Sequence, residues 1–349
     1  MAVTIKQIAE RTGVSPATVS MVLNSRRGIG VETRDRVLAA ANDLGYRQRR
    51  RIVETATRTV RFLRIVKHGH ILNPNHRVFI ADYIDGIERE ARNWACTLEV
   101  SSYERFDPAE LTASLETGSV AGAIVLGTEL TEEDLEALRG TAKPLVFIDT
   151  FHNSLNFDFV DMDNDSSVFS VVEYLRRQGH RRIGLVQGSV PTRNFRLREH
   201  SFFESLEHFG LAFDPGDSFA IDSTYEKGKE DMERQLAGRT SLPSALFCVN
   251  DIVAYGCANA LKDAGFAIPG DVSLVGFDDL PSNSFMSPTL TSVKVSKHRI
   301  GQCAMQLMAL RLDTPGRSAE KILVGGELVL RDSVGSVTNL MPAPRAGAR

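Results

Sequence analysis

The feature that constrains this chain most is a repeated change of hydrophobic period after about residue 62. Short apolar segments, typical of buried strands, alternate there with longer amphipathic segments of helical period. The strand-like segments are Phe62–Val66, Ala123–Leu126, Leu145–Ile148, Ile183–Val186, Leu246–Val249 and Ser273–Phe277. The helix-like segments are 80–95, 165–178, 197–209, 252–264 and 297–312. This alternation predicts parallel sheets covered by helices, the doubly wound α/β arrangement.

The length of this α/β region predicts two lobes. Roughly 270 residues exceed the usual size of one domain built on a single sheet. We therefore expect the chain to leave the first lobe near residues 161–163 and to cross back near residues 287–293. A crevice between two such lobes is a common place for a small ligand.

Polar residues stand at the carboxyl ends of several predicted strands. Asp149 follows LVFI, Asn250 and Asp251 follow LFCV, and Asp278 and Asp279 follow LVGF. In open α/β sheets ligands bind beyond these ends, where carboxylates and amides can hold the hydroxyls or ring nitrogens of a small polar molecule. Side chains at such positions also cap the following helix in many proteins, so each residue has two interpretations. Their recurrence on several strands favours a ligand site.

The first residues predict a separate all-α unit of three short helices. Thr4 and Gln7 have capping-box spacing, Gly13 suits a turn, and Ser15 followed by Pro16 is typical of a helix start. A third helix is expected to begin near residue 32 or 33 and to stop at residue 45. The apolar residues predicted to face the core of this unit are Ile5, Ile8, Ala9, Val14, Val19, Val22, Leu23, Val37, Leu38, Ala41 and Leu44. A glycine turn between two short helices is typical of a helix-turn-helix, whose second helix enters the major groove of DNA.

Charge is distributed unevenly along the chain. Residues 1–67 carry fourteen Lys or Arg against five Asp or Glu, a net charge of +9 in a chain whose total is −3. A basic module on an acidic body predicts contact with phosphates at one end. A solvated charged surface would explain the charge alone equally well, and the helix-turn-helix pattern favours DNA.

Two segments of the predicted all-α unit resemble a known family. The runs TIKQIAERTGVSPATVSMVLN and ETRDRVLAAANDLGYR resemble the headpiece of the lactose-repressor and galactose-repressor (LacI/GalR) family. The resemblance implies that Pro16, Ala17 and Met21 face the bases of a double-stranded DNA operator. It also implies that a set of polar residues lies near phosphates: Thr4, Ser15, Thr18, Ser20, Asn24 and Thr33.

The chain departs from the family pattern at two places that set specificity. Met21 stands where the family often has an arginine that reads guanine, so we expect an apolar contact there, such as one with a thymine methyl group. In the connector, Thr55 stands where relatives have a leucine that enters the minor groove, and Arg49, Arg50 and Arg51 precede it. These arginines are predicted to contact phosphates or a narrow minor groove, with Ile52 or Val53 as the wedge. A flexible solvated linker is the alternative.

The resemblance extends over the α/β body and implies a periplasmic-binding-protein-like effector domain. The matching segments are DNDSSVFSVVEYLRRQGHRRIGLV, CVNDIVAYGCANALKDAGFAIPGDVSLVGFDDL and SPTLTSVKV. By resemblance, the expected effector contacts are Asp149, Arg198, Asn250 and Asp278, with Arg193 and Arg196 as further arginines that a solvated surface would equally explain. Ser201 replaces a family glycine after Arg198, and Ser223, with Tyr225 nearby, occupies the place of a stacking aromatic.

The loop KHGHILNPNHRVF also departs from the family. It predicts that His68, His70, Asn73 and Phe79 build an uncommon part of the pocket. Two histidines at this spacing suggest a metal, but the sequence places no third ligand, so loop histidines are the preferred interpretation. Cys96, Cys248, Cys257 and Cys303 lack metal-binding spacing and predict buried reduced thiols.

These observations favour one functional class over two others. We expect a transcription regulator, most simply a repressor, that acts as a homodimer and responds to a sugar or related metabolite. An exported solute-binding protein would need an export signal and would lack a headpiece, whereas the sequence shows a headpiece and no such signal. An enzyme would need a catalytic motif, and the sequence shows none. No cofactor or metal is expected. The expected organisation is a headpiece at 1–47, a basic hinge at 48–61, a two-lobed domain at 62–340 and a tail at 341–349. We expect a cytoplasmic protein without a membrane span. We also expect no tetramerising coil.

Overall fold

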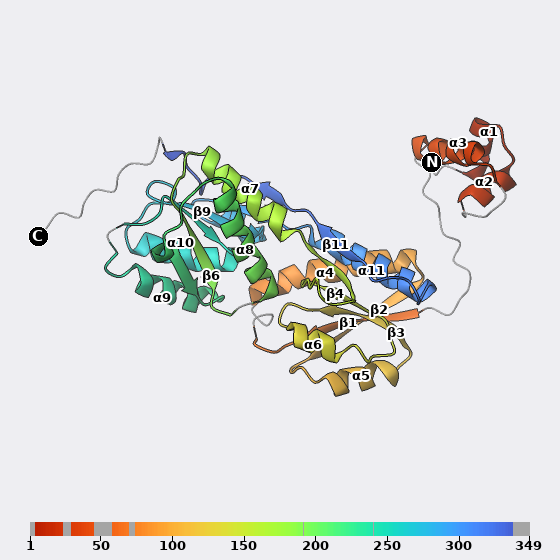
Figure 1. The fold of residues 1–349 in the computed structure, drawn as a ribbon, viewed down its shortest axis with the longest axis horizontal. Helices are drawn as coiled ribbons and strands as arrows, with labels where there is room; N and C mark the ends of the chain where they lie inside the picture. The colour runs from red at the N-terminus through yellow and green to blue at the C-terminus, as the bar shows by residue number, and fades with distance from the viewer. Residues whose placement is uncertain are drawn as a thin grey trace, which may run out of the picture. The chain divides into compact units, whose positions relative to one another are not determined.

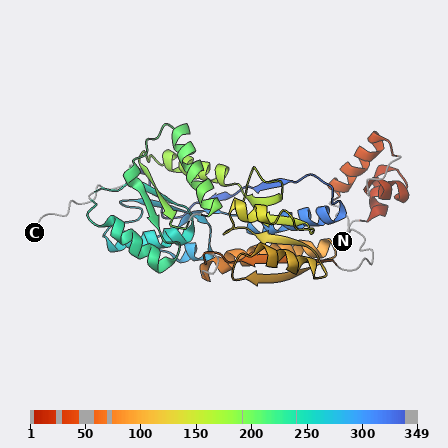
Figure 2. The same ribbon diagram turned by 60° about the horizontal axis from the view of Figure 1, so that its bottom comes forward.

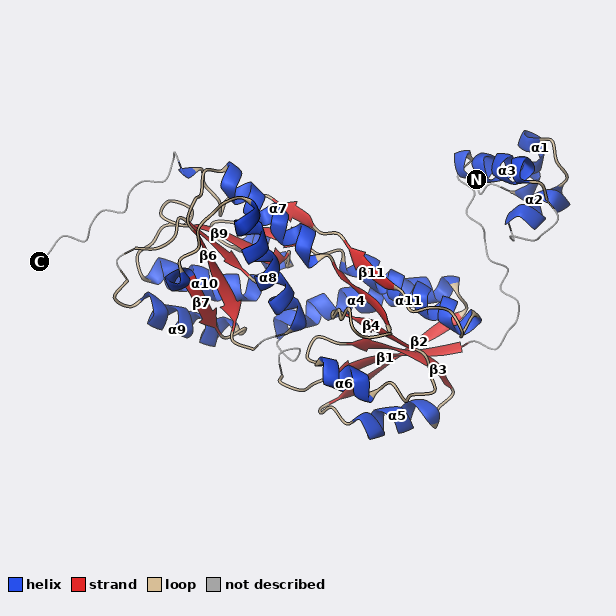
Figure 3. Cartoon of the chain, viewed as in Figure 1, coloured by secondary structure: helices blue, strands red, loops and turns tan. Residues whose placement is uncertain are grey.

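The protein consists of two compact units, Met1–Thr55 and Ala56–Arg349 (Figure 1). The computed structural model describes residues 4–23, 29–44, 58–69, 74–190, 192–239 and 241–337. The first unit is helical throughout its ordered elements, whereas the second combines helices with two sheets (Figure 3).

The first unit contains the three predicted helices, α1 (Ile5–Thr12), α2 (Pro16–Leu23) and α3 (Val31–Asp43). The Thr4 hydroxyl accepts a hydrogen bond from the Gln7 N–H at 3.4 Å, and the Thr4 N–H donates to Gln7 Oε1 at 2.8 Å. Gly13 ends α1 with a φ of +69°, and the Thr18 N–H donates to Ser15 Oγ at 3.1 Å at the start of α2. The capping box, the turn glycine and the second cap are confirmed.

The core of this unit matches the expected pattern except at one position of α3. Ile8, Val19 and Val37 are fully buried. Leu38, predicted to be buried, is 46% exposed, and Ala40 is buried instead. The reason is helical geometry, because Val37, Ala40 and Ala41 are spaced by three and four residues and share a face, whereas a residue next to Val37 is rotated about 100° away.

The second unit contains two sheets of six strands each. The first sheet has the order β11 (Lys321–Val324), β5 (Asp158–Met162), β4 (Leu145–Ile148), β3 (Val120–Leu126), β1 (Arg58–Ile65) and β2 (Cys96–Tyr103). The second has the order β12 (Glu327–Val329), β10 (Thr291–Lys294), β9 (Ser273–Asp278), β8 (Ala245–Cys248), β6 (Ile183–Gly188) and β7 (Ser218–Ile221). All of these strand pairs are parallel except β10 with β12.

Each sheet and its helices form one lobe. The helices of the first lobe are α4 (Pro74–Asn93), α5 (Pro108–Glu116), α6 (Glu132–Ala137) and α11 (Lys297–Asp313). Those of the second lobe are α7 (Asn164–Arg177), α8 (Arg193–His208), α9 (Tyr225–Leu236) and α10 (Asp251–Asp263), with short 3-10 turns at Pro215–Asp217 and Pro281–Phe285. The two-lobed, doubly wound fold predicted from the sequence is confirmed.

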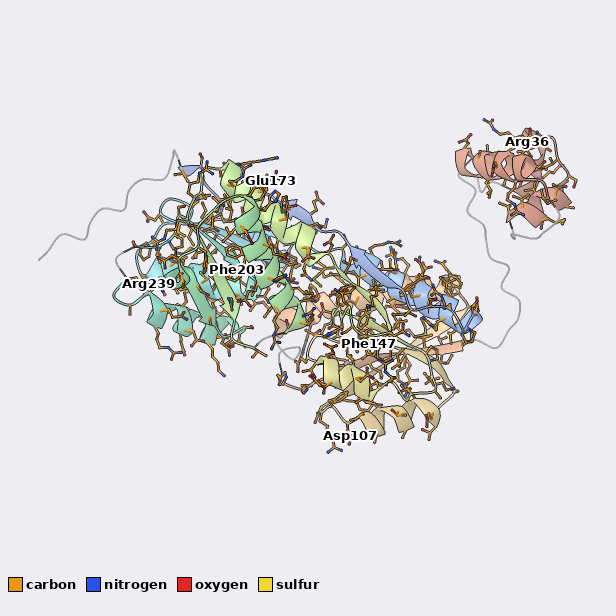
Figure 4. The ribbon with its side chains drawn as sticks, in the orientation of Figure 1. Arg36, Asp107, Phe147, Glu173, Phe203 and Arg239 are labelled. Atoms are coloured by element: carbon orange, nitrogen blue, oxygen red, sulfur yellow. The ribbon has the colours of Figure 1, made fainter. Side chains whose placement is uncertain are left out.

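Alternation along the strands explains why helices cover both faces of the first sheet. On β1, Val60 and Phe62 are buried in the cluster that contains residues of α4 and α11, whereas Leu63 and Ile65 are buried with residues of α5 and α6. The side chain of Phe147 on β4 belongs to this second cluster (Figure 4). A strand buried on both faces has a continuous apolar sequence, which is why β1, β3 and β4 could be recognised.

The chain passes between the lobes three times, and Figure 2 shows the lobes side by side. The first crossing lies between β5 and α7, at Met162 and Asp163, as expected. The second lies between β10 and α11, at residues 295–296, later than the predicted range of 287–293, because residues 291–294 still pair with β9. A third crossing at Gly325 and Gly326, between β11 and β12, was not predicted.

Glycines allow α4 and α11 to pack closely. A Cβ added at Gly86 would collide with the backbone oxygen of His298, and one at Gly301 would collide with the backbone oxygen of Tyr83. The two helices therefore approach backbone to backbone, and α11 is fixed to the first lobe although it follows the second lobe in sequence.

Two expectations about the chain as a whole concern its cysteines and membranes. Cys96, Cys248, Cys257 and Cys303 are buried free thiols, as predicted. Among the described residues, no helix has the length and apolar character needed to cross a bilayer.

Candidate effector site and DNA-reading helix

A cavity of about 30 Å³ lies between the two lobes. Its lining comprises Phe79, Ile80, Thr128 and Asp149 from the first lobe and Thr192, Asn194, Phe195, Arg198, Asn250 and Asp278 from the second. Five of the residues proposed from the sequence for the effector pocket, Phe79, Asp149, Arg198, Asn250 and Asp278, are brought together here. The cavity has room for only one or two water molecules at about 10–15 Å³ each, so side chains occupy most of the space between the lobes.

Strand ends position the polar part of the lining. Thr128 follows β3, Asp149 follows β4, Asn250 follows β8 and Asp278 ends β9. Asp149 and Asp278 have φ angles of +58° and +110°, which non-glycine residues rarely adopt. Such strain persists only where surrounding contacts hold it, and it gathers at binding and catalytic sites.

Asp149 is the centre of a hydrogen-bond network in the first lobe. It accepts hydrogen bonds from the Tyr83 hydroxyl at 3.0 Å and from the Thr128 hydroxyl. Burial raises the pKa of Asp149, while these bonds and the charge of Arg198 oppose the rise. Burial also raises the pKa of Asp161 well above its usual range, and the neighbouring Asp149 raises it further.

Asn194 on α8 links this network to the second lobe. Its Nδ2 donates to Asp149 Oδ1 and to Asp161 Oδ1, both at 3.3 Å, and its Oδ1 accepts from Asn164 Nδ2 at 2.9 Å. Arg193 donates from Nε to the Phe151 carbonyl oxygen at 2.9 Å. The start of α8 therefore holds the two lobes together.

Arg198 is buried, and each of its three guanidinium nitrogens donates one hydrogen bond. Its guanidinium donates to Asn164 Oδ1 at 2.9 Å, to the Val249 carbonyl oxygen at 2.6 Å and to Met162 Sδ at 2.8 Å. It also lies 3.6 Å from Asp278 Oδ1 and stacks on the Phe277 ring, with 3.7 Å from Cζ to the centroid. This arrangement orients the arginine but leaves little capacity for a further anion.

Two buried polar atoms in the lining have no hydrogen-bond partner among the described residues, Asn250 Nδ2 and Asp278 Oδ1. Asn250 also caps α10, since its Oδ1 accepts from the Val253 N–H at 2.9 Å, so both interpretations of this residue hold. Burial raises the pKa of Asp278 to about 6, although Arg198 and Lys297 counteract the rise. A buried donor and acceptor without partners are costly, and a polar ligand would satisfy them.

Asp251 and Asp279 directly follow the lining residues Asn250 and Asp278, but their carboxylates are bound by structural partners. Asp251 accepts from the Ser292 hydroxyl at 2.6 Å, the Leu280 N–H at 2.7 Å and Asn283 Nδ2 at 2.9 Å. Asp279 forms an ion pair with Arg331 at 2.7 Å. Neither residue lines the cavity.

Other residues of the predicted pocket lie elsewhere. His68 is exposed, and neither it nor Ser223, Tyr225 or Arg196 lines the cavity. His70 and Asn73 lie outside the described residues. No group of three or more His, Cys, Asp or Glu side chains suited to a metal ion occurs in the part of the chain that the structure describes.

Sequence reasoning missed half of the lining, namely Ile80, Thr128, Thr192, Asn194 and Phe195. Thr128 follows a strand as Asp149 does, so the strand-end rule could have found it. Asn194 and Phe195 precede Arg198 by four and three residues, and helical spacing from Arg198 would have placed them on its face.

The proposed DNA contacts that the structure describes are exposed or half-buried in the first unit. Pro16 and Ala17 are exposed at the start of α2, Met21 is half-buried, and Val19 and Val22 face the core. The polar candidates Thr4 and Ser15 are exposed, while Thr18, Ser20 and Thr33 are half-buried. Asn24, Arg49, Arg50, Arg51 and Ile52 lie outside the described residues.

Comparison with known proteins agrees with this architecture. A family model for bacterial regulatory proteins of the lacI family matches residues 4–48, and a model for a periplasmic binding protein-like domain matches residues 172–334. Among solved structures, a complex of the transcriptional regulator CelR with cellobiose has a TM-score of 0.70 at 23% identity, covering 95% of this chain and 99% of that one. The lac repressor dimer bound to operator and the anti-inducer ONPF has the same TM-score and identity, covering 98% and 100%.

Curated relatives match along nearly their whole length. The HTH-type transcriptional repressor PurR of Haemophilus influenzae is 29% identical over 343 residues, covering 96% of this chain and 99% of the relative. The HTH-type transcriptional repressor CytR of Escherichia coli is 30% identical over 339 residues, covering 95% and 96%. These proteins are repressors, not enzymes, which agrees with the expected absence of catalysis. The chain therefore belongs to the lacI family of bacterial regulatory proteins.

Proposed function

We propose that this protein represses transcription from an operator whose affinity is controlled by a small, neutral, hydroxyl-rich metabolite, a sugar or sugar derivative, held between the two lobes. The observation that carries the proposal is a pair of buried atoms in the inter-lobe lining that form no hydrogen bond with any described residue, Asn250 Nδ2 and Asp278 Oδ1. Asp278 Oδ1 has only the longer ion-pair contact with Arg198 at 3.6 Å. A hydroxyl both donates and accepts, so hydroxyl groups would satisfy this donor and this acceptor together.

The charges of the site favour a neutral ligand over an anionic one. The lining carries two buried carboxylates, Asp149 and Asp278, and one cation, Arg198, each of whose guanidinium nitrogens already donates a hydrogen bond to the protein. The nearby Lys297 donates from Nζ to the Asp278 backbone oxygen at 2.7 Å. A sugar acid or phosphate ester would therefore meet carboxylates without a cation to spare, whereas a neutral polyol would not.

Apolar surface on both lobes supports the same class of ligand. Phe79 comes from α4 of the first lobe and Phe195 from α8 of the second. Aromatic faces with a few polar groups are typical of sites for sugars and related metabolites. The small cavity means that the lobes must separate to admit such a ligand, which couples binding to their relative position.

For the DNA-binding unit we propose the familiar arrangement in which α2 enters the major groove. Pro16, Ala17 and Met21 would face bases, and the polar set Thr4, Ser15, Thr18, Ser20, Asn24 and Thr33 would lie near phosphates. Arg49, Arg50 and Arg51 would contact phosphates, with Ile52 as a minor-groove wedge. A homodimer would place two such units on a two-fold symmetric operator.

The coupling between sites can be tested without knowing either ligand in advance. Selection of duplexes by the purified protein would yield the operator, and thermal shift against neutral sugars, sugar acids, nucleosides and nucleobases would yield the effector. Because linkage is reciprocal, the effector must then change operator affinity by the same factor by which operator changes effector affinity. Failure to enrich any duplex, with or without the small molecules, would contradict the proposal.

A variant tests the inter-lobe site directly. Asn250→Ser keeps an N-cap oxygen for α10 but removes the unsatisfied Nδ2 donor, so the unfolding temperature of the free protein should change little. We expect effector affinity to fall about tenfold, as for the loss of one hydrogen bond to a buried group. An unchanged effector affinity would exclude Asn250 from the site, and a stabilising sugar acid would exclude the neutral class.

A further inference from the structure

A second and larger cavity lies in the first lobe, away from the inter-lobe site. It has a volume of about 220 Å³ and is formed by the starts of β4 and β5, the end of α11 and the segment that follows α11. Because parallel strands run in one direction, this edge of the sheet is opposite to the edge that carries Thr128 and Asp149. The two cavities are therefore separate sites.

The lining of this cavity is basic. Four cationic residues contribute to it, Arg139, Lys143, Arg311 and Arg317, against a single carboxylate, Asp158. The effector site has the opposite balance, with two carboxylates and one arginine. The linings of the two cavities therefore differ in the sign of their excess charge.

Structural pairing accounts for only part of the positive charge. Asp158 is buried and receives a bidentate contact from Arg311 Nε and Nη2, at 2.9 and 2.8 Å, and a hydrogen bond from the Glu320 N–H at 2.7 Å. Arg139 pairs with Glu136, and Arg317 pairs through Nη2 with Glu320. After these pairs are formed, the carboxylate in the lining is already neutralised.

Two donors remain after this pairing. Lys143 is half-buried and forms neither an ion pair nor a hydrogen bond with any residue that the structure describes. The Nη1 atom of Arg317 is buried and meets no acceptor among the same residues. A buried guanidinium N–H without an acceptor is costly, and an anionic oxygen is its strongest partner.

We propose that this cavity binds a phosphate group, held by Lys143 and Arg317 and flanked by Arg139. Phosphate offers several acceptor oxygens to donors that converge from different segments, which a single hydroxyl does not. The volume accommodates a phosphorylated small molecule, and a backbone phosphate of DNA presents the same chemistry.

Strand β1 begins at Arg58 and runs parallel to β3, which runs parallel to β4, so Arg58 lies at the same end of the first sheet as the cavity.

The experiment compares two charge-matched variants of the full chain. Lys143→Gln removes the unpaired cation, and Lys227→Gln removes an exposed lysine of the second lobe. Inorganic phosphate is titrated by phosphorus NMR at constant ionic strength, and binding of a random-sequence duplex is measured against salt. We expect Lys143→Gln to weaken phosphate binding about tenfold while Lys227→Gln leaves it unchanged.

The outcomes separate the two sources of phosphate. Loss of inorganic phosphate binding in Lys143→Gln alone identifies a free anion site. If the unmodified protein binds no inorganic phosphate, and the salt dependence of duplex binding becomes shallower in Lys143→Gln but not in Lys227→Gln, the occupant is a DNA phosphate. Equal behaviour of the two variants in both assays overturns the proposal. Should Lys143→Gln fail to fold by circular dichroism, Arg139→Gln replaces it with the same expectations.

Discussion

The contacts of Asn194 predict how firmly the lobes are held together in the absence of ligand. Asn194→Ala removes the Nδ2 donor that reaches Asp149 and Asp161 of the first lobe at 3.3 Å each. These distances are at the long end of the hydrogen-bond range, but both acceptors are buried carboxyl groups. We expect the closed arrangement to lose about 2 kcal/mol, a change of about thirtyfold in the ratio of closed to open forms.

Native-state hydrogen exchange measures this ratio directly. Backbone amides at the start of α8 and after β4 that exchange only when the lobes separate should do so about thirtyfold faster in Asn194→Ala. Asn259→Ala is the matched control, because Asn259 Nδ2 donates to the Tyr255 carbonyl oxygen within the second lobe. Equal acceleration in both variants, or none in Asn194→Ala, would refute the role of Asn194 as an inter-lobe link.

Three further predictions concern pH, packing and DNA specificity. Because the pKa of Asp278 is about 6 in the folded protein against an ordinary 3.8, the folded state binds this proton more tightly, so the free energy of unfolding falls as pH rises through this range. Asp278→Asn should flatten that fall in urea unfolding between about pH 4 and 6, and an unchanged slope would contradict the assignment. Gly301→Ala should cost about 1–3 kcal/mol in urea unfolding because its Cβ meets the Tyr83 backbone, whereas Gly140→Ala, with open space around it, should cost little. Met21→Arg should create a preference for guanine at one operator position in duplex selection, and an unaltered selected sequence would remove this residue from the base contacts.

Hydrophobic period predicted the strands with an unbroken apolar sequence and missed strands that contain exposed or charged residues. Half of the residues of β2 are exposed, and β5 carries Asp158 and Asp161 among its apolar residues. Asp158 is tolerated in a buried strand because Arg311, far along the chain, neutralises it. Such a partner cannot be identified from local sequence. A buried strand that contains a charged residue paired with a distant partner therefore lacks the apolar pattern by which strands are predicted.

The effector site was more predictable than the second cavity for a geometric reason. Strand ends meet at one edge of a parallel sheet, so Asp149, Asn250 and Asp278 could be assigned to one place from their positions in sequence and from family resemblance. Lys143 and Arg317 line one cavity only because the segment after α11 passes beside the start of β4. The sequence contains no rule that pairs these two residues.

The three crossings of the chain between the lobes have a consequence for biosynthesis. The sheet face that carries Val60 and Phe62 is completed by α11, which emerges from the ribosome only after the entire central part of the second lobe. Domains generally fold in the order in which they are translated. Here the first lobe is translated first, but its helix α11 is translated only after the central part of the second lobe. A nascent chain that pauses before residue 297 would expose this apolar face, which makes it the expected site of chaperone engagement during translation.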